Sequence, residues 1–296
     1  MSSLNEAGKY RFIRPAPALR RYITAYYFFE LDAPDGHERE DVLHPEWASA
    51  RFLLEGSVDA SIVPHPPTTV PLASITGPTL RACCIRFGKA KMAGIGLLPL
   101  GWHHFIGIDA SKRANQVFDV AREPAFSLFD EIWHRIGTLR DAEKIATEFD
   151  TLLLAALDPP DAREEEIEAF HMALTNPDMA NVAQLAETLD MASQRIERLS
   201  RRVFGFPPKR LLRRQRFLRS LGVRLLDPEL RWTSAMDTQY YDQAHFTRDF
   251  YDFMGMSPRV YLAMPRPISR AAVRARADAL GQPLQVLQRP QRDEGR

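Results

Sequence analysis

Gln194, Arg198 and Arg201 are the side chains whose types and spacing best suit a specific chemistry in this 296-residue chain. If residues 193–204 form a helix, these three side chains share one face at about 100° per residue. Arginine can donate two hydrogen bonds to the edge of a guanine, and glutamine can pair similarly with an adenine. The segment is therefore predicted to read bases with one face and to pack through the other. The packing face is formed by Ile196, Leu199 and Val203.

The same pattern recurs 50 residues later, which indicates an internal duplication. Arg198, Gly205 and Pro208 recur as Arg248, Gly255 and Pro258. In the second copy, the outward positions are Ala244, Arg248 and Tyr251, and the apolar stripe is Phe246, Phe250 and Phe253. An aromatic stripe at helical spacing is typical of packing, so we do not interpret it as a cofactor site.

Other elements must hold these two helices in place. Asn181 is suited to cap a short amphipathic helix, with Gln184 completing a capping box. The turn at residues 190–192 then leads into the first base-reading helix, as in a helix-turn-helix unit. A basic amphipathic helix over residues 209–226, about 27 Å long, would join the two units. Paired amphipathic helices also form plain bundles, but the duplication with matched arginines favours two consecutive major-groove contacts.

Charge is divided unevenly along the chain. The net charge is only +1, but residues 1–180 carry 18 basic against 26 acidic residues, and residues 181–296 carry 21 against 12. The strongest excess, 11 basic against 3 acidic residues, lies in residues 181–226. A basic segment of this kind is typical of nucleic-acid binding, although a solvated basic helix would look the same by charge alone.

Two stretches resemble the halves of an AraC-type DNA-binding domain. They are LAETLDMASQRIERLSRRVFGFPPKRLLRRQRF and YYDQAHFTRDFYDFMGMSPRVY, within about residues 163–264. The resemblance implies a seven-helix domain with recognition helices near residues 193–204 and 243–254. Three positions differ from the family pattern: Asp190 and Gln239 replace turn glycines, and Ala192 replaces a serine. The segment 231–237 also lacks the regular apolar pattern of the helix that precedes the second turn.

The residues expected to contact double-stranded DNA lie on these two helices. On the first helix they are Ser193, Gln194, Arg195, Glu197, Arg198, Arg201 and Arg202. On the second helix they are Gln243, Ala244, Thr247, Arg248 and Tyr251.

The N-terminal part is predicted to be rich in β-strands. Short apolar or alternating runs at residues 25–30, 51–54, 58–63, 81–87 and 91–98 are separated by Gly and Pro. Segments such as PAPALRRYITAYYFFE and GIGLLPLGWHHFIG resemble a cupin-like sensor domain over residues 10–120, which implies effector binding, dimerisation or both. We expect a ligand site for an unknown small molecule around Trp47, Trp102 and His103.

The predicted fold class is α+β, with three regions in chain order. Helices are expected at residues 124–136, 141–157 and 163–175, and the proline pair at 159–160 suggests a boundary. The regions are a cupin-like sensor or dimerisation domain (1–158), an AraC-type domain with two helix-turn-helix units (159–264) and a tail (265–296). The tail is expected to hold one short helix before a polar, disordered end.

Several other chemistries are disfavoured by the sequence. His44, His65, His103 and His104 lack metal-ligand spacing, so no metal or other cofactor is expected. Cys83 and Cys84 are neighbours in an apolar run and suit packing better than a thiol sensor. Gly94-Ile95-Gly96 lacks the third glycine of a dinucleotide loop, because Pro99 stands there.

The sequence therefore favours a DNA-binding regulator over an enzyme or a binding module with scaffold helices. No apolar run approaches the roughly 18 residues needed to span a membrane, and residues 1–14 lack a secretory core. We expect a cytoplasmic protein. RNA polymerase and a second copy of the chain are left open as further partners.

Overall fold

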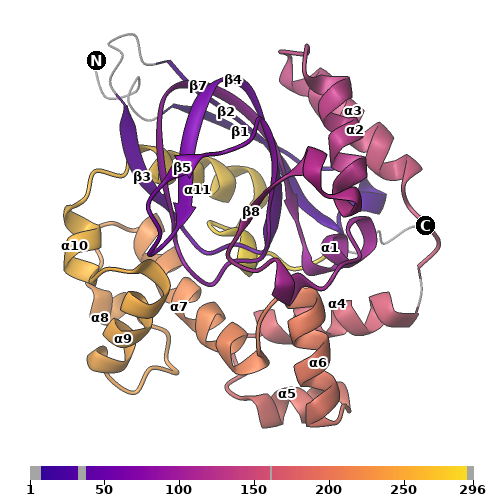
Figure 1. Cartoon of the computed structure of the whole chain (residues 1–296). Coiled ribbons are helices and arrows are strands. Elements are labelled where there is room, and N and C mark those ends of the chain that lie inside the picture. Colours follow the sequence, from indigo (N-terminus) through magenta and orange to yellow (C-terminus); the bar gives the residue numbers. More distant parts are fainter. Residues whose placement is uncertain (1–7, 33–37, 161, 292–296) are drawn as a thin grey trace.

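The computed structural model describes residues 8–32, 38–160 and 162–291. A single antiparallel sheet formed by the first 119 residues is followed by helices, and Figure 1 shows the sheet above most of the helices of the C-terminal half. The predicted α+β class, with a β-rich N-terminal domain before a helical region, is confirmed. No helix within the described residues has the length and apolar character that crossing a membrane requires.

The sheet is organised around two 15-residue strands, β4 (Ala48–Ile62) and β7 (Cys83–Leu97), which pair along their length. The pairing shifts register twice, between Leu53 and Glu55 and between Gly56 and Val58. Such bulges bend a strand and increase its twist, so the sheet curves and encloses space on one side. The runs 51–54 and 58–63 were expected as separate strands, as were 81–87 and 91–98. Each pair is in fact one continuous bent strand.

Shorter strands complete the sheet, whose order is β1-β2-β7-β4-β6-β8, with β3 on β7 and β5 on β4. Their bounds are β1 (Lys9–Ile13), β2 (Ile23–Leu31), β3 (Arg39–Leu43), β5 (Thr68–Thr69), β6 (Ala73–Thr76) and β8 (Val117–Asp119). This part of the chain also contains α1 (Pro99–Phe105), which precedes β8, and α2 (Ser127–Ile136) and α3 (Ala142–Ala155), which follow it. The last two lie where the sequence pattern predicts helices.

The helical region agrees closely with the pattern read from the sequence. Its helices are α4 (Ala162–Thr175), α5 (Val182–Leu189), α6 (Ser193–Phe204), α7 (Pro208–Leu226), α8 (Trp232–Ala235), α9 (Gln243–Met254) and α10 (Pro258–Ala263). The two expected recognition helices have the predicted bounds. The element before the second turn is a single turn of helix, which matches its lack of a regular apolar pattern.

The segment after residue 264 has a longer helix than the short one expected, and the last residues of the expected disordered end, 292–296, lie outside the described residues. It forms the 14-residue helix α11 (Pro267–Leu280) and the 3-10 turn η5 (Gln285–Leu287), and its backbone is described as far as residue 291. The buried carboxylate of Asp41 on β3 accepts hydrogen bonds from the backbone N–H groups of Ile268 and Ser269, at 2.8 and 2.9 Å. The helix therefore begins against the β domain and packs on β1 and β3.

One continuous hydrophobic core joins the two regions. It runs from Phe52 and Ile95 of the sheet through Trp47 to Phe204 and Phe217 of the helices. Helix α4, just after the expected boundary, is also tied to the β domain, because Glu164 accepts a 2.8 Å hydrogen bond from the Tyr22 hydroxyl. A break in helical structure does fall at residues 157–160. The limits of the predicted domains stay a prediction.

Candidate nucleic-acid interface

The first helix-turn-helix unit is formed by α5 and α6. The Asn181 side chain accepts from the Gln184 N–H (3.0 Å), which confirms the predicted cap. The Gln184 side chain accepts from the N–H of Ala180 (2.9 Å), one residue before the Asn181 N–H that a capping box uses. Asp190 ends α5 in the left-handed conformation (φ +48°) in which glycine is usual. The chain therefore makes the tight turn despite its departure from the family pattern.

Helix α6 presents a polar face and buries the opposite one. Ile196, Leu199 and Val203 are buried as predicted. Arg195 forms an ion pair with Glu166 (2.6 Å) and Arg201 one with Glu197 (2.8 Å). Arg198 and Arg202 form no ion pair with any described residue. The side chains exposed on this helix are Ser193, Gln194, Arg195, Arg198, Arg201 and Arg202, whereas Glu197 is half-buried.

The second unit is formed by α8 and α9. Asp242 caps α9 by accepting from the His245 N–H at 2.6 Å, and Gln239 reaches the Pro177 carbonyl at 2.6 Å. Gln243, Ala244, Arg248 and Tyr251 are exposed, whereas Thr247 is half-buried and donates to the Gln243 carbonyl. Tyr241 was not among the expected contacts, yet its side chain is 94% exposed beside the start of this helix. In the sequence, only its position next to the capping residue Asp242 could have pointed to Tyr241 as an exposed side chain.

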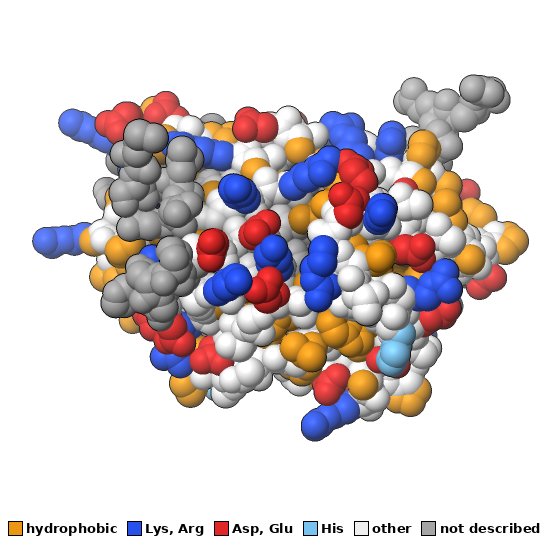
Figure 2. All heavy atoms as spheres, turned by 90° about the horizontal axis from the view of Figure 1, so that it is seen from above, with side chains coloured by type: hydrophobic (Ala, Val, Ile, Leu, Met, Phe, Trp, Pro, Cys, Tyr) orange, Lys and Arg blue, Asp and Glu red, His pale blue; other side chains and the backbone are white. Residues whose placement is uncertain are grey.

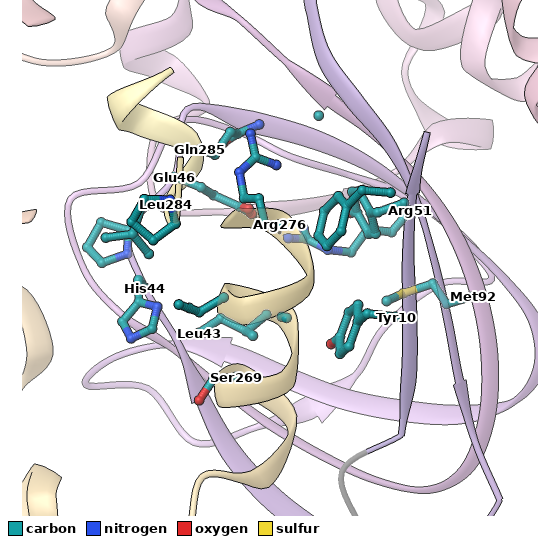
Figure 3. A pocket seen from close by; sticks show the side chains of 17 residues that line it. Tyr10, Leu43, His44, Glu46, Arg51, Met92, Ser269, Arg276, Leu284 and Gln285 are labelled. Atoms are coloured by element: carbon teal, nitrogen blue, oxygen red, sulfur yellow. Dashed lines mark hydrogen bonds and ion pairs between the residues drawn. The ribbon is translucent and has the colours of Figure 1, made fainter. Parts of the chain in front are cut away.

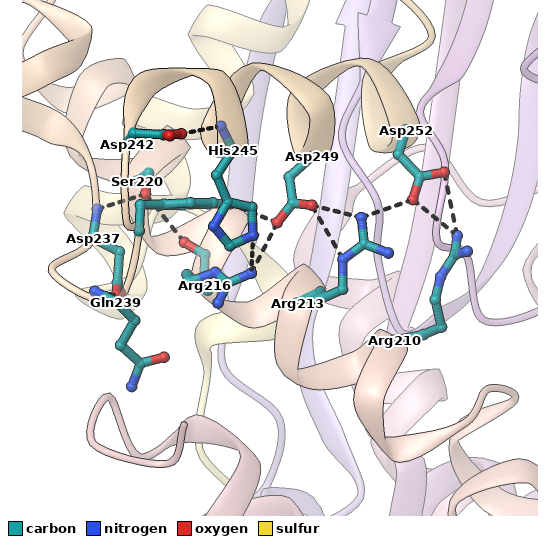
Figure 4. Close-up of polar contacts among 11 residues, drawn as sticks. Arg210, Arg213, Arg216, Ser220, Asp237, Gln239, Asp242, His245, Asp249 and Asp252 are labelled. Carbon is teal, nitrogen blue, oxygen red and sulfur yellow. Dashed lines mark hydrogen bonds and ion pairs between the residues drawn. The ribbon is translucent and has the colours of Figure 1, made fainter. Parts of the chain in front are cut away.

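The basic helix α7 turns most of its arginines inward, toward the acidic residues of the second unit. The buried carboxylate of Asp249 pairs with Arg213 (2.6 Å) and Arg216 (3.2 Å), and it accepts a hydrogen bond from the Tyr240 hydroxyl at 3.0 Å (Figure 4). The remaining pairs of the network are Arg210–Asp252, Arg213–Asp252 and Arg219–Asp237. These arginines of α7 therefore hold the second unit in place on the connecting helix. Because their charges are paired, they are unavailable to a nucleic acid. The same contacts neutralise Asp237, Asp249 and Asp252 of the second unit.

Arg214 is the one arginine of α7 that enters the β domain. It is fully buried, its Nη1 donates to the Thr79 carbonyl at 2.8 Å, and its guanidinium carbon lies 3.9 Å from the centre of the Trp47 ring. Burial lowers the pKa of Arg214 to about 9. The connecting helix is therefore anchored to the sheet as well as to the second unit.

The residues expected to bind a ligand, Trp47, Trp102 and His103, are not among those that line the cavities described below. Trp47 is buried under Arg214. Trp102 is buried, and its indole N–H donates to the Ile108 carbonyl at 2.9 Å. Aromatic side chains at these positions serve packing, because the shared core passes through them. His103 is partly exposed.

A cavity of about 130 Å³ lies instead between the curved sheet and α11. Figure 3 shows α11 beside side chains of the sheet, including Tyr10, Arg51 and Met92. Arg51 pairs with Glu46, whereas the Arg276 side chain donates to Gln288 and lies over the Phe12 ring. The Tyr27 hydroxyl is buried near the Ser49 side chain, and the Arg276 Nε is buried without a described hydrogen-bond partner. A neighbouring cavity of about 60 Å³ shares Tyr10, Leu43, Arg51 and Met92 with this one.

The cysteines and histidines of the β domain form no reactive cluster among the described residues. Burial raises the pKa of the Cys83 thiol to about 12 and also raises that of Cys84. Both thiols are free, and they stay protonated near neutral pH.

Two family models match the chain. A helix-turn-helix domain matches residues 185–264, which include both units and the DQAHFTRDF motif. The C-terminal region is an AraC-type helix-turn-helix domain. A domain of unknown function, DUF6597, matches residues 11–119 and covers the sheet.

Three solved structures illustrate a distant similarity to this chain. An apo form of ToxT from Vibrio cholerae, carrying one substitution, is 12% identical, with 81% of this chain and 97% of that chain covered at a TM-score of 0.41. ToxT with a bound unsaturated fatty acid is 11% identical, with 80% and 94% covered at a TM-score of 0.40. The AraC-like activator CuxR is 12% identical, with 73% and 88% covered at a TM-score of 0.24. No curated protein matches the chain.

Proposed function

We propose that α6 and α9 enter two consecutive major-groove segments of double-stranded DNA and that the chain regulates transcription in the cytoplasm. The observation that carries this proposal is the pair of exposed arginines at matched positions, Arg198 and Arg248, on helices joined by α7. Helix α7 has 19 residues, so it is about 28 Å long, close to the ~34 Å repeat of B-DNA. Arg213 of α7 forms ion pairs with Asp249 and Asp252, and Arg214 stacks on Trp47. These contacts favour a fixed spacing of the two reading helices.

The two units are proposed to contribute unequally, with the first supplying most of the affinity. Helix α6 offers Gln194 and Arg198 to the groove, whereas α9 offers Arg248 beside Ala244 and Tyr251. Ala192 leaves the N-terminal N–H groups of α6 without a side-chain cap, so a DNA phosphate can accept from them. At α9 the same position holds Asp242, whose carboxylate occupies an N–H group and repels phosphate.

The cavity between the sheet and α11 is the proposed effector site in place of Trp47, Trp102 and His103. An engineered cavity of about 150 Å³ holds a benzene ring, so a cavity of about 130 Å³ suits a small organic molecule. Aromatic and aliphatic side chains line the cavity together with two hydrogen-bond donors, the Tyr27 hydroxyl and the unpartnered Arg276 Nε. We propose an effector with an apolar body and an acceptor or acidic group directed toward these donors.

The DNA-binding part is tested by fluorescence anisotropy with the full chain and duplex from its own upstream region. We expect specific binding whose affinity falls steeply between about 50 and 200 mM salt, as phosphate contacts require. A scrambled duplex of equal length is the control. Equal binding to both duplexes, or binding that is insensitive to salt, would contradict the proposal.

The effector part is tested by thermal melting of the full chain with small carboxylic acids and neutral analogues. A ligand of the cavity should raise the melting temperature of the wild type. Ala272→Phe, which places a ring at the cavity wall, should remove that rise. A shift that survives Ala272→Phe would place the ligand elsewhere.

We propose no catalytic activity for this chain. RNA polymerase and a second copy of the chain remain candidate partners, for which sedimentation of the free and DNA-bound protein is the first test.

A further inference from the structure

A groove of about 290 Å³ lies where the end of α7, α10 and the start of α11 meet. Four arginines line it against one acidic residue, Glu229. The arginines are Arg224, Arg266, Arg270 and Arg274. None of the lining residues belongs to α6 or α9, so the groove is separate from the proposed base-reading faces.

Arg266 is the most unusual of these residues, because it is a buried cation that pairs with no acidic side chain among the described residues. Its exposed fraction is 3%, and its guanidinium carbon stacks 3.7 Å from the centre of the Tyr261 ring. Its Nε and Nη1 atoms have no described hydrogen-bond partner. The nearby buried carboxylate of Asp41 already accepts from the N–H groups of Ile268 and Ser269 and from the Ser269 hydroxyl. Burying a charge without a counter-ion is destabilising, so a bound anion would stabilise this arginine.

The spacing along α11 points to the same conclusion. Arg266, Arg270 and Arg274 follow one another at intervals of four residues, so they form a single stripe on the helix. Like charges at this spacing destabilise a helix, and cations near a helix N-terminus oppose the helix dipole. None of the three forms an ion pair with any residue in the described part of the chain. Arg224 completes the arrangement from α7, and its Nε also lacks a described partner.

The upper face of the molecule does not show this concentration of one charge. Figure 2 views that face from above the orientation of Figure 1, and acidic and basic side chains are interspersed on it. The excess of arginine in a concave site therefore contrasts with the mixed charge of this face.

We propose that this groove binds a small polyanion, a free molecule that carries phosphate or several carboxylate groups. Guanidinium groups fit both chemistries through paired hydrogen bonds. A duplex backbone is a poorer candidate, because Arg266 lies buried at the groove while DNA presents a convex surface. A bound polyanion would join α11, which Asp41 holds on the β domain, to α7 and α10 of the helix-turn-helix domain. It would thereby strengthen the connection between the two regions.

The test uses the full chain and two probes, inorganic pyrophosphate and citrate, followed by calorimetric titration at low ionic strength. At least one probe should bind, and the double variant Arg270→Ala/Arg274→Ala should weaken binding by at least tenfold. Both side chains are exposed, so we expect this variant to fold. Arg259→Ala, which removes an exposed arginine of α10 outside the groove, is the matched control and should bind like the wild type. The stronger probe tells whether phosphate or carboxylate is preferred.

Two outcomes would overturn the proposal. One is the absence of binding for both probes, and the other is an equal loss in the double variant and in Arg259→Ala. If neither probe binds and the double variant also loses affinity for duplex DNA, the groove contacts DNA instead. Since probe binding is measured without DNA, the result is independent of the proposed function.

Discussion

The guanidinium group of Arg214 stacks on the ring of Trp47 and thereby fixes the connecting helix α7 to the β domain. It also donates to two backbone carbonyls, of Thr79 at 2.8 Å and of Glu46 at 3.3 Å, while no carboxylate of a described residue pairs with it. The side chain therefore stabilises the junction chiefly by its volume, its stacking and these two hydrogen bonds. Its charge opposes burial.

Replacing Arg214 separates these contributions. Arg214→Ala should lower the free energy of unfolding by about 3 kcal/mol, because it leaves a cavity in the shared core. Arg214→Met retains most of the volume and removes the buried charge, so its cost should stay below about 1.5 kcal/mol. Denaturant unfolding of the full chain measures both. Equal losses in the two variants would show that the charge and its hydrogen bonds dominate.

Stability should decrease as the pH falls, because buried histidines are neutral in the fold. Burial, assisted by the charge of Arg214, lowers the pKa of His171 to about 3, and neither ring nitrogen has a described partner. Burial and the charge of Arg266 lower the pKa of His44 to about 3 as well. An unfolded histidine binds its proton near pH 6.5. Between pH 6.5 and 3 the unfolded state therefore binds more protons, and stability falls by up to about 1.4 kcal/mol per pH unit for each histidine.

His171→Phe should remove one of these two contributions. Between pH 7 and pH 5 the free energy of unfolding should fall by about 2 kcal/mol less in the variant than in the wild type. The decrease in stability that is due to His44 should remain in both. Urea midpoints at the two pH values give the comparison. Parallel changes in both proteins would mean that His171 is protonated in the fold.

Asp242 at the start of α9 should weaken DNA binding by its charge and not by its hydrogen bond. Asn caps a helix as well as Asp, so Asp242→Asn should keep the melting temperature and tighten DNA binding several-fold at low salt. Asp278→Asn, an exposed change on α11, is the control. If both variants gain equally, the effect comes from net charge alone and not from the helix terminus.

The recognition helices could be predicted because their periodicity, caps and duplication are local signals. Residues 193–204 and 243–254 are helical as expected, and Ile196 and Phe246 are buried. The merging of four runs into β4 and β7 could not be predicted, since bulges depend on how both strands pair. The length of helix α11 was underestimated because its arginines give the segment a polar composition. Its burial depends on long-range partners such as Asp41 and Phe12.

The site was only partly predictable for the same reason. The outward faces of α6 and α9 follow from the helix period, but the pairing of Arg213 with Asp249 spans 36 residues. A count of basic residues therefore overestimates the charge available to DNA. Trp47 and Trp102 drew attention by type, whereas the cavity residues Tyr27 and Arg276 are brought together by the fold alone.

The central claim is that the two units bind DNA together, with the first dominant, and paired titrations of Arg198→Ala and Arg248→Ala on one operator at fixed salt test it most directly. Arg198→Ala should cost about 1 to 3 kcal/mol of specific binding, the range expected when a bidentate base contact is lost. Arg248→Ala should cost measurably less. An Arg248→Ala loss that equals or exceeds the loss for Arg198→Ala, or no loss in either variant, would contradict the account.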